Sequence, residues 1–552
     1  MRPGETTATG APAQPSDGRP PETRAEKLNT KAAGVVAVAV MCSRVLGLAR
    51  DQILAALFPG RLLDAYIIAF RIPNLLRDLF AEGALSTAFV TTFSKTSALE
   101  GDAAAWRLAN KVTTLAIVVL SALTIVGIIF SPWLVSVLAP GFERDIEKAT
   151  LTITLTRVMY PFILLVSLAA LVMGMLNAKN VFGVPAMASS FFNMGSIAAG
   201  AALGYWIDPH FGQKALLGFS IGTLIGGGLQ LGVQLPALRR VGYVFHPDFQ
   251  WRDSGVKAIL RLMGPSVIAA STTQVNVLVN SVFASELGDS RTWWLQAAFR
   301  LMQLPLGIFG VALGTVSLPL LARMAAGGNT DGFRTNLAHG LRLAFLLCIP
   351  STVGLIMLAE PIISILFQHG AQSYEDTVEV AGALRYYAIG LCGYAALKVL
   401  VNAFYAIDKR KTPMIVSFIA VALNLFLNWL FTFHLQWGHR GLAFSTSCIA
   451  TTNFLILYLL MRGHLGKLES KTMLHMLAKL AVAAGVLAAV CWAGLHFLLA
   501  NWATAAFLVK AGELALVISI GAAAFFVCAS ALGITELREI TQAVQRKLLR
   551  RV

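Results

Sequence analysis

The chain has 552 residues and a formal net charge of +16, with 57% hydrophobic and only 13% charged residues. Its mean hydropathy of +0.70 is higher than a soluble domain could solvate, so the composition excludes a soluble protein. We predict an all-α polytopic membrane protein. Six cysteines without a C-x-x-C pair imply neither a disulfide framework nor a metal site.

Apolar runs of membrane-spanning length, each about 20 residues, predict about fourteen transmembrane helices. The runs cover residues 33–57, 65–92, 112–139, 151–176, 184–206, 215–237, 262–285, 294–321, 341–367, 379–406, 414–434, 441–461, 476–500 and 505–533. The preceding residues 1–28 contain no apolar run and predict a disordered cytoplasmic tail, not a signal peptide.

Landmarks of the first six helices recur in the next six at an offset of 228 or 229 positions. The pairs are Phe70-Arg71 and Phe299-Arg300, Phe80 and Phe309, Pro132 and Pro361, Gly141 and Gly370, Arg157 and Arg385, and Pro185 and Pro413. Because each copy has an even number of helices, the copies share one orientation and are parallel repeats, with a substrate site expected between them.

These runs and repeats predict five regions. They are a tail at 1–28, two six-helix bundles at 29–240 and 241–465, two additional helices at 466–534, and a basic cytoplasmic tail at 535–552. The last region carries five basic residues on a helical pattern, and we expect it to lie against anionic lipid headgroups.

The positive charge is concentrated on one side of the predicted membrane. With the N-terminus inside, 29 of the 44 Lys and Arg residues fall on cytoplasmic segments, and only 7 fall outside. The outer seven are Arg61, Arg144, Lys148, Lys214, Arg291, Arg440 and Lys510. This bias follows the positive-inside rule, so both termini are predicted to be cytoplasmic and no nucleic-acid partner is expected.

Eight basic residues remain inside the predicted spans: Arg44, Arg50, Arg71, Arg77, Arg157, Arg300, Arg385 and Lys398. A charge at the centre of a spanning helix costs at least about 2.5 kcal/mol, so each such residue is a candidate for function. Arg157 and Arg385 have an alternative, because they could extend towards the outer surface. Arg71 could be a packed arginine paired with Asp64. Function is the stronger interpretation for Arg44, Arg50, Arg77 and Arg300.

Other features indicate packing. Gly218, Gly222 and Gly226 have the small-xxx-small spacing of closely packed helices. Asn424 and Asn428 share one helix face, where they could bind a cation, although interhelical hydrogen bonding is the better interpretation. Phosphate-loop and H-E-x-x-H motifs are absent from the sequence. We therefore expect no catalytic residue, no metal and no cofactor.

Several long motifs closely resemble the MurJ/MviN family of bacterial lipid II flippases. They are S-R-V-L-G-L-A-R-D at Ser43–Asp51, D-A-Y-x-x-A-F-R-I-P-N-L-L-R at Asp64–Arg77, F-A-E-G-A-L-S at Phe80–Ser86, M-G-P at Met263–Pro265, F-R-L-M-Q-L-P-L-G-I-F-G-V-A-L-G-T at Phe299–Thr315 and K-T-P at Lys411–Pro413. The resemblance implies the multidrug/oligosaccharidyl-lipid/polysaccharide exporter fold and a multi-pass protein of the bacterial cytoplasmic (inner) membrane. It also implies lipid II as the substrate and contact with membrane lipids. Other cell-wall synthesis proteins are further candidate partners.

The family's important arginines fall on Arg44, Arg50, Arg77 and Arg300, and its acidic partner near the outer end falls on Asp64. The two additional helices would form a groove for the polyprenyl tail. Asp78 and Gln303 depart from the family pattern, which often has arginine and an acidic residue at these positions.

Clustered arginines suit a pyrophosphate because their planar forks match phosphate geometry. We expect Asp64 and Glu82 to pair with arginines in one state of an alternating-access cycle and to release them in the other. Three alternatives remain open at this point: a flippase for another polyprenyl-linked glycan, an ion-coupled drug exporter, and a scaffold without transport activity.

Overall fold

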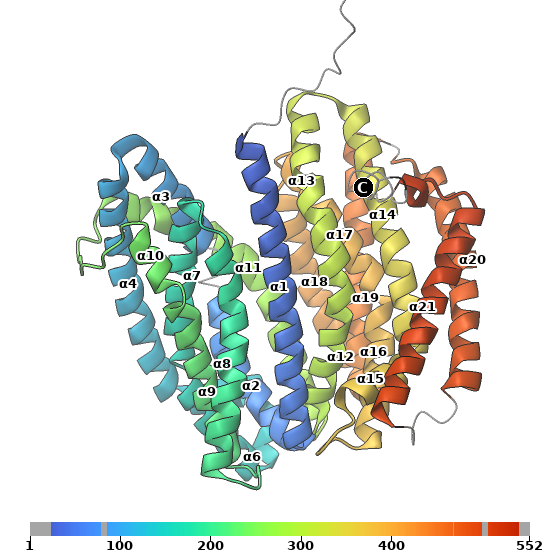
Figure 1. Cartoon of the computed structure of the whole chain (residues 1–552), viewed down its shortest axis with the longest axis horizontal. Helices are drawn as coiled ribbons and strands as arrows, with labels where there is room; N and C mark the ends of the chain where they lie inside the picture. The colour runs from blue at the N-terminus through green and yellow to red at the C-terminus, as the bar shows by residue number, and fades with distance from the viewer. Residues whose placement is uncertain (1–23, 79–84, 467, 500–505, 540–541, 543–552) are drawn as a thin grey trace, which may run out of the picture.

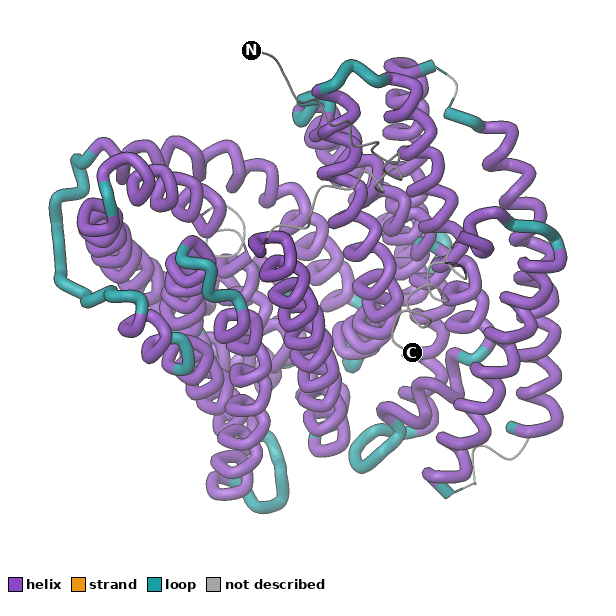
Figure 2. Tube along the Cα trace, turned by 45° about the horizontal axis from the view of Figure 1, so that its top comes forward, coloured by secondary structure: helices purple, strands orange, loops and turns teal. Residues whose placement is uncertain are grey.

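The computed structural model describes residues 24–78, 85–466, 468–499, 506–539 and 542. Within these residues the chain consists of helices joined by loops, without a strand, as Figure 2 shows. The predicted all-α class is therefore confirmed. Glu82, residues 1–23 of the first predicted tail and most of the second lie outside the described residues.

The first repeat comprises α1 (Arg24–Leu57), α2 (Gly60–Arg77), α3 (Ser86–Glu100), α4 (Asp102–Ile129), α5 (Ser131–Leu138), η2 (Pro140–Arg144), α6 (Ile146–Met159), α7 (Phe162–Ala178), α8 (Gly183–Ile207), α9 (Ala215–Gly232) and α10 (Leu235–Arg240). The second comprises α11 (Ser254–Glu286), α12 (Arg291–Pro305), η3 (Leu306–Gly310), α13 (Val311–Ala326), α14 (Thr330–Met357), α15 (Ala359–Phe367), α16 (Tyr374–Ile389), α17 (Leu391–Ala406), α18 (Lys411–Trp429), η4 (Leu430–His434) and α19 (Gly438–Leu465). Beyond the repeats lie α20 (Ser470–Ala493), η5 (Gly494–Leu498) and α21 (Phe507–Ala531).

The helix bounds reproduce the predicted repeat. An offset of 229 moves α4 from Asp102–Ile129 to 331–358, and α14 runs from Thr330 to Met357. The same offset moves the short α5 to 360–367, where α15 ends at Phe367. The two halves lie side by side with α1 between them, and α20 and α21 flank the second half (Figure 1).

We call the end of the bundle where α1 begins the near end, and the opposite end, where α1 finishes at Leu57, the far end (Figure 1). The seven basic residues predicted to be outside all belong to turns and helix starts at the far end. α21 runs from the far end to the near end, so α1 begins and α21 finishes on the same side.

Nine helical segments of the described chain are long and apolar enough to cross a membrane, or ten if the bent pair α16 and α17 is one span. The predicted count of fourteen stays a prediction. α2 is not among these segments. Its 18 residues include the charged residues Arg61, Asp64, Arg71 and Arg77, and Arg77 belongs to the predicted site.

Two equivalent predicted spans, one in each repeat, are interrupted near a proline. The run 112–139 divides where α4 ends at Ile129 and Pro132 opens the short α5. The run 341–367 divides at the equivalent place, before Pro361 in α15. Proline lacks an N–H to continue a helical ladder but is well placed in a first turn. Each predicted single helix is thus a long helix followed by a short one.

Close packing of α8 on α9 explains the glycine spacing. A Cβ atom on Gly218 would lie 2.3 Å from the backbone nitrogen of Gly204, and one on Gly222 would lie 2.5 Å from Gly200. A Cβ on Gly226 would lie 2.5 Å from the carbonyl oxygen of Phe192. The packing interpretation of these glycines is confirmed, because only a residue without a side chain allows this approach.

The apolar core shows where the repeats are joined. One buried cluster combines Leu54 and Leu63 of the first repeat with Trp293 and Ile363 of the second, and these residues lie towards the far end. A second cluster combines first-repeat helices with Val256 and Ile259 of α11, and a third joins the second repeat to α20 and α21. The halves therefore share apolar packing at the far end and also where α11 packs on the first repeat.

Candidate functional site

A cavity of about 830 Å³ lies between the two repeats. Side chains from α1, α2, α8 and α9 line it on one side, and side chains from α11 and α12 line it on the other. Among the described residues, its charged side chains are Arg44, Arg50, Arg71, Arg77, Arg300, Asp51 and Asp78. Five arginines against two aspartates give the wall an excess of positive charge, and several amides, Asn74, Asn193, Gln230, Gln274, Gln296 and Gln303, add neutral hydrogen-bonding groups.

Asp51 joins the two repeats within this cavity. Its Oδ1 atom lies 3.2 Å from Nη2 of Arg50, and its Oδ2 atom lies 2.8 Å from Nη2 of Arg300. The Asp51 side chain is only 11% exposed, and two arginines compensate for the desolvation of its carboxylate. The Arg50 guanidinium also lies 5.7 Å from the ring centroids of Phe70 and of Phe192, within the range of a cation–π contact. Asp51 was not among the predicted site residues.

The two departures from the family pattern have specific contacts. Asp78 accepts a hydrogen bond from Nη2 of the neighbouring Arg77 at 2.7 Å and another from Gln274 on α11 at 3.3 Å. The backbone carbonyl of Gln303, and not its side chain, accepts a hydrogen bond from Arg44 at 3.4 Å. Arg77 thus has a carboxylate beside it, whereas the described contact of Arg44 is with a neutral group.

Arg71 is a cavity residue, and its predicted pairing with Asp64 is wrong. Its guanidinium donates to Oγ of Ser281 on α11 at 2.5 Å and to Oε1 of Gln296 on α12 at 2.9 Å. Positions 64 and 71 are about two helical turns apart, so the two side chains lie about 10 Å from each other along the axis. Asp64 binds Lys148 instead.

Asp64 lies at the far end, outside the cavity lining. It is fully buried, with its Oδ2 atom 2.9 Å from Nζ of Lys148 and its Oδ1 atom accepting a hydrogen bond from the backbone N–H of Trp293 at 2.8 Å. Lys148 also lies 2.8 Å from Asp289. Sequence analysis placed Lys148 on the outer side of the membrane, and the structure shows that its side chain is only 3% exposed. It links a carboxylate of the first repeat to one of the second.

Two glycine contacts close the far end in a reciprocal manner. A Cβ atom on Gly141 of the first repeat would lie 2.1 Å from the carbonyl oxygen of Ser285 in the second. A Cβ on Gly370 of the second repeat would lie 2.0 Å from the carbonyl oxygen of Ala56 in the first. Both members of one contact are displaced by 229 positions from those of the other. The repeats therefore meet there through equivalent surfaces.

The remaining intramembrane basic residues stand outside the cavity lining. Arg157 donates to Ser131 at 3.0 Å, and Arg385 pairs with Glu360 at 2.7 Å. Positions 131 and 360 are themselves equivalent, so both repeats hold this arginine through the same short helix. Lys398, on α17, does not line the cavity either.

The asparagine pair takes part in interhelical hydrogen bonding. Nδ2 of Asn428 donates to Asn424 at 3.0 Å and to Asn280 on α11 at 2.8 Å, and Asn280 donates to Thr446 at 3.3 Å. Across the described residues, no group of three or more His, Cys, Asp or Glu side chains could hold a metal ion. The amide cluster thus joins α11, α18 and α19 through hydrogen bonds.

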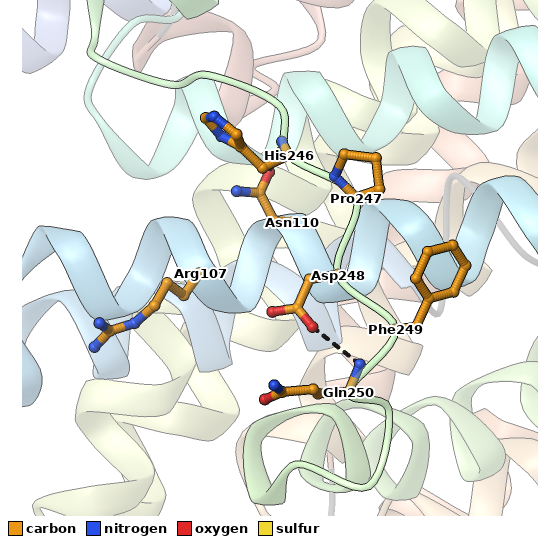
Figure 3. A pocket seen from close by; sticks show the side chains of 7 residues that line it. All are labelled: Arg107, Asn110, His246, Pro247, Asp248, Phe249 and Gln250. Carbon is orange, nitrogen blue, oxygen red and sulfur yellow. Dashed lines mark hydrogen bonds between the residues drawn. The ribbon is translucent and has the colours of Figure 1, made fainter.

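A second pocket, of about 590 Å³, lies where the linker between the repeats crosses α4. Figure 3 shows His246, Pro247 and Asp248 along the linker beside Asn110 of α4. Asn110 accepts a hydrogen bond from the backbone N–H of His246 at 3.2 Å, and Thr114 accepts one from that of Asp248 at 3.0 Å. These bonds fasten the linker to the first repeat. The pocket lacks the converging arginines of the cavity, which remains the better candidate.

Comparison with known proteins agrees with this architecture. The family model described as "Lipid II flippase MurJ" matches residues 53–511. The lipid II flippase MurJ of Burkholderia cenocepacia is 35% identical over 463 residues, covering 83% of this chain and 88% of the relative. The probable lipid II flippase MurJ of Rhizobium meliloti is 34% identical over 516 residues, covering 92% and 95%.

Solved structures show the same fold. Lipid II flippase MurJ in an inward closed conformation superimposes with a TM-score of 0.72 at 26% identity, covering 89% of this chain and 98% of that one. An inward-facing multidrug resistance transporter of the MATE family and MOP superfamily matches with a TM-score of 0.67 at 15% identity, covering 79% and 99%. With its apolar spans, its two repeats and this match along most of its length, the chain is a multi-pass membrane transporter that belongs to the lipid II flippase MurJ family.

Proposed function

We propose that this protein moves lipid II from the inner to the outer leaflet of the bacterial cytoplasmic membrane. The observation that carries the proposal is the charge of the cavity between the two repeats. Its described lining contains five arginines and only two aspartates. A pyrophosphate offers about two negative charges and several acceptor oxygens, which arginine forks bind in a bidentate manner. The lipid II flippase relatives support the identity of the headgroup.

Arg44, Arg50, Arg77 and Arg300 are the proposed ligands of the pyrophosphate and of the carboxylates on the peptide. All four line the cavity. Asp64 contributes at a distance, through the ion pair with Lys148 that joins the repeats at the far end. Glu82 stays a predicted partner of the arginines, because it lies outside the described residues.

The proposed transport cycle is alternating access. Lipid II enters laterally between the halves from the cytoplasmic leaflet, its headgroup fills the cavity, and the repeats then rock about it while the polyprenyl tail stays in the lipid. In this cycle the near end faces the cytoplasm, both termini are cytoplasmic, and the far-end contacts form the outer gate. The concentration of basic residues towards the near end supports this orientation.

A cation-exporting function is less compatible with the cavity. A drug exporter that binds cations needs acidic groups in its site, whereas each aspartate of this cavity is already engaged by arginine. Transport of a cationic dye by purified protein in vesicles would favour the exporter. Absence of dye transport is the expected result.

The direct test measures whether lipid II in cells can be reached by a toxin added outside. A strain that depends on this protein is depleted of it, and a toxin that cleaves lipid II is added outside. We expect lipid II to remain uncleaved on depletion and to be cleaved again when the wild-type protein is restored. Cleavage at the wild-type level in depleted cells would contradict the proposal, and accumulation of a different polyprenyl-linked glycan would indicate another substrate.

A further inference from the structure

Arg71 and Arg300 occupy equivalent positions of the two repeats. Each follows a phenylalanine, at Phe70 and Phe299, and the offset between them is 229. Arg71 lies on α2 and Arg300 on α12, and both line the cavity. The two repeats thus each contribute one arginine of the same origin to the central space.

The partners of these two arginines differ in charge. Arg300 reaches across to the carboxylate of Asp51 in the other repeat, at 2.8 Å. Position 280 is the equivalent of position 51, and it holds asparagine. The Asn280 side chain is already engaged, since it accepts a hydrogen bond from Asn428 and donates one to Thr446. The second repeat therefore supplies no equivalent carboxylate.

Arg71 reaches across in the same manner but contacts only neutral groups. Its partners are the hydroxyl of Ser281 and the side-chain carbonyl of Gln296, both in the second repeat. Among the described residues no carboxylate forms an ion pair with it. A guanidinium in a partly desolvated cavity gains much more from an anion than from a neutral acceptor. An incoming anion can therefore displace the neutral partners at a net gain.

We propose that Arg71 is a further anion-binding residue, which exchanges Ser281 and Gln296 for phosphate oxygens when the headgroup enters. The inference rests on the proposed function, because it requires an anionic headgroup in this cavity. It also gives Arg71 a second effect: since both neutral partners belong to the second repeat, anion binding releases two hydrogen bonds between the repeats.

The test uses an isosteric substitution that leaves every arginine in place. Gln296→Glu replaces the neutral acceptor, 2.9 Å from Arg71, by a carboxylate of the same shape. Gln230→Glu is the matched control, because it adds the same charge elsewhere on the cavity wall. Binding of inorganic pyrophosphate to the purified full-length protein in detergent is measured by calorimetry for both variants, for Arg71→Gln and for Arg300→Gln.

We expect Gln296→Glu and Arg71→Gln each to weaken pyrophosphate binding about tenfold or more, the value of a charge-assisted hydrogen bond. Gln230→Glu should cause a clearly smaller loss of pyrophosphate affinity, because it changes the electrostatic field in the cavity without forming an ion pair with Arg71. If Arg300→Gln weakens binding but Gln296→Glu and Arg71→Gln do not, the role of Arg71 is refuted while the cavity assignment survives. If the wild type does not bind pyrophosphate, or Arg300→Gln has no effect, the cavity assignment fails and the inference fails with it.

A folding defect is separated from a binding defect by two measurements. The level of each variant in membranes and its elution as a single species in detergent report on folding. Gln296→Glu conserves volume and gives Arg71 an ion pair, so we expect normal levels. Should Arg71→Gln be poorly produced, the comparison of Gln296→Glu with Gln230→Glu decides the question alone, and equal losses in these two variants would overturn the inference.

Discussion

The Oδ1 atom of Asp64 accepts a hydrogen bond from the backbone N–H of Trp293 at 2.8 Å, and position 293 is the equivalent of position 64 in the other repeat. The repeats therefore meet at the far end through corresponding residues with different chemistry. Asp64 supplies a buried carboxylate, and Trp293 supplies a backbone donor and an apolar side chain. Lys148 completes the contact by binding Asp64 and Asp289.

Removing the charge of Lys148 should destabilise the far end. Lys148→Met conserves much of the apolar volume but leaves the buried Asp64 carboxylate without its cation, which costs about 3–5 kcal/mol when the charge persists. We expect a lower midpoint of thermal unfolding in detergent, partly restored by Asp64→Asn in the same chain. Lys214→Met is the control, because Lys214 is exposed at the same end. Equal effects of the two lysine substitutions would contradict the assignment.

Adding a methyl group at the reciprocal glycines should disturb the outer gate. Gly370 has φ +61° and a Cβ there would lie 2.0 Å from the oxygen of Ala56, so Gly370→Ala is both strained and overpacked, at a cost of about 1–3 kcal/mol. We expect greater reactivity of a cavity cysteine towards an impermeant thiol reagent applied outside, together with reduced transport. Gly141→Ala should act similarly. Gly228→Ala, which meets nothing within 4 Å, should leave the reactivity unchanged.

Single substitutions of the cavity arginines should abolish transport without preventing folding. Arg50→Ala and Arg300→Ala each leave Asp51 with one arginine, so the protein should still reach the membrane while the headgroup loses a ligand. Lysine should restore function only in part, because it keeps the charge but not the two-pronged geometry. Complementation of a depleted strain, beside quantified membrane levels, provides the measurement for these positions and for Arg44 and Arg77. Normal growth with every alanine variant would refute the site.

The double variant Arg50→Ala/Arg300→Ala should behave differently from either single variant. It leaves Asp51, only 8% exposed, without either ion-pair partner, and an unpaired buried carboxylate is strongly destabilising. Its membrane level should therefore fall well below that expected from the two single variants together. A level equal to that of the single variants would show that Asp51 is not stabilised by these arginines.

The short helical segment after α21 should lose stability in acid. Glu536 is 3% exposed and binds Arg342 of α14, which also binds Glu469. Burial raises the pKa of Glu536, but hydrogen bonds from a backbone N–H and from Arg342 outweigh it, so the pKa lies below its ordinary value of 4.5. A lowered pKa means that the carboxylate stabilises the folded state above pH 4.5 and that this stability is lost as the pH falls through the folded-state pKa.

The substitution Glu536→Gln isolates this effect. Thermal unfolding measured from neutral pH downwards should show a steeper acid loss for the wild type than for Glu536→Gln. Glu539→Gln is the control, because the Glu539 side chain is 64% exposed and exposed pairs contribute little. Parallel curves for the wild type and Glu536→Gln would contradict the role of this carboxylate.

The sequence alone predicted the class, the repeat and the arginines that line the cavity. Membrane-length apolar runs, a constant offset and arginines inside spanning helices are properties of local composition and spacing, and they are the same whichever way the helices dock. The interruptions near Pro132 and Pro361 were not predicted, because the apolar runs continue through both prolines and indicate single spans.

Only the tertiary structure decided which charges meet. Asp51 and Arg300 are 249 positions apart in the sequence, and their ion pair depends on how α1 of one repeat faces α12 of the other. The burial of Lys148 and the neutral partners of Arg71 arise in the same way, from contacts across the repeats. Spacing along one helix predicts the face on which a side chain lies. The residue that this side chain contacts on another helix depends on how the two helices dock, and local sequence patterns do not encode that docking.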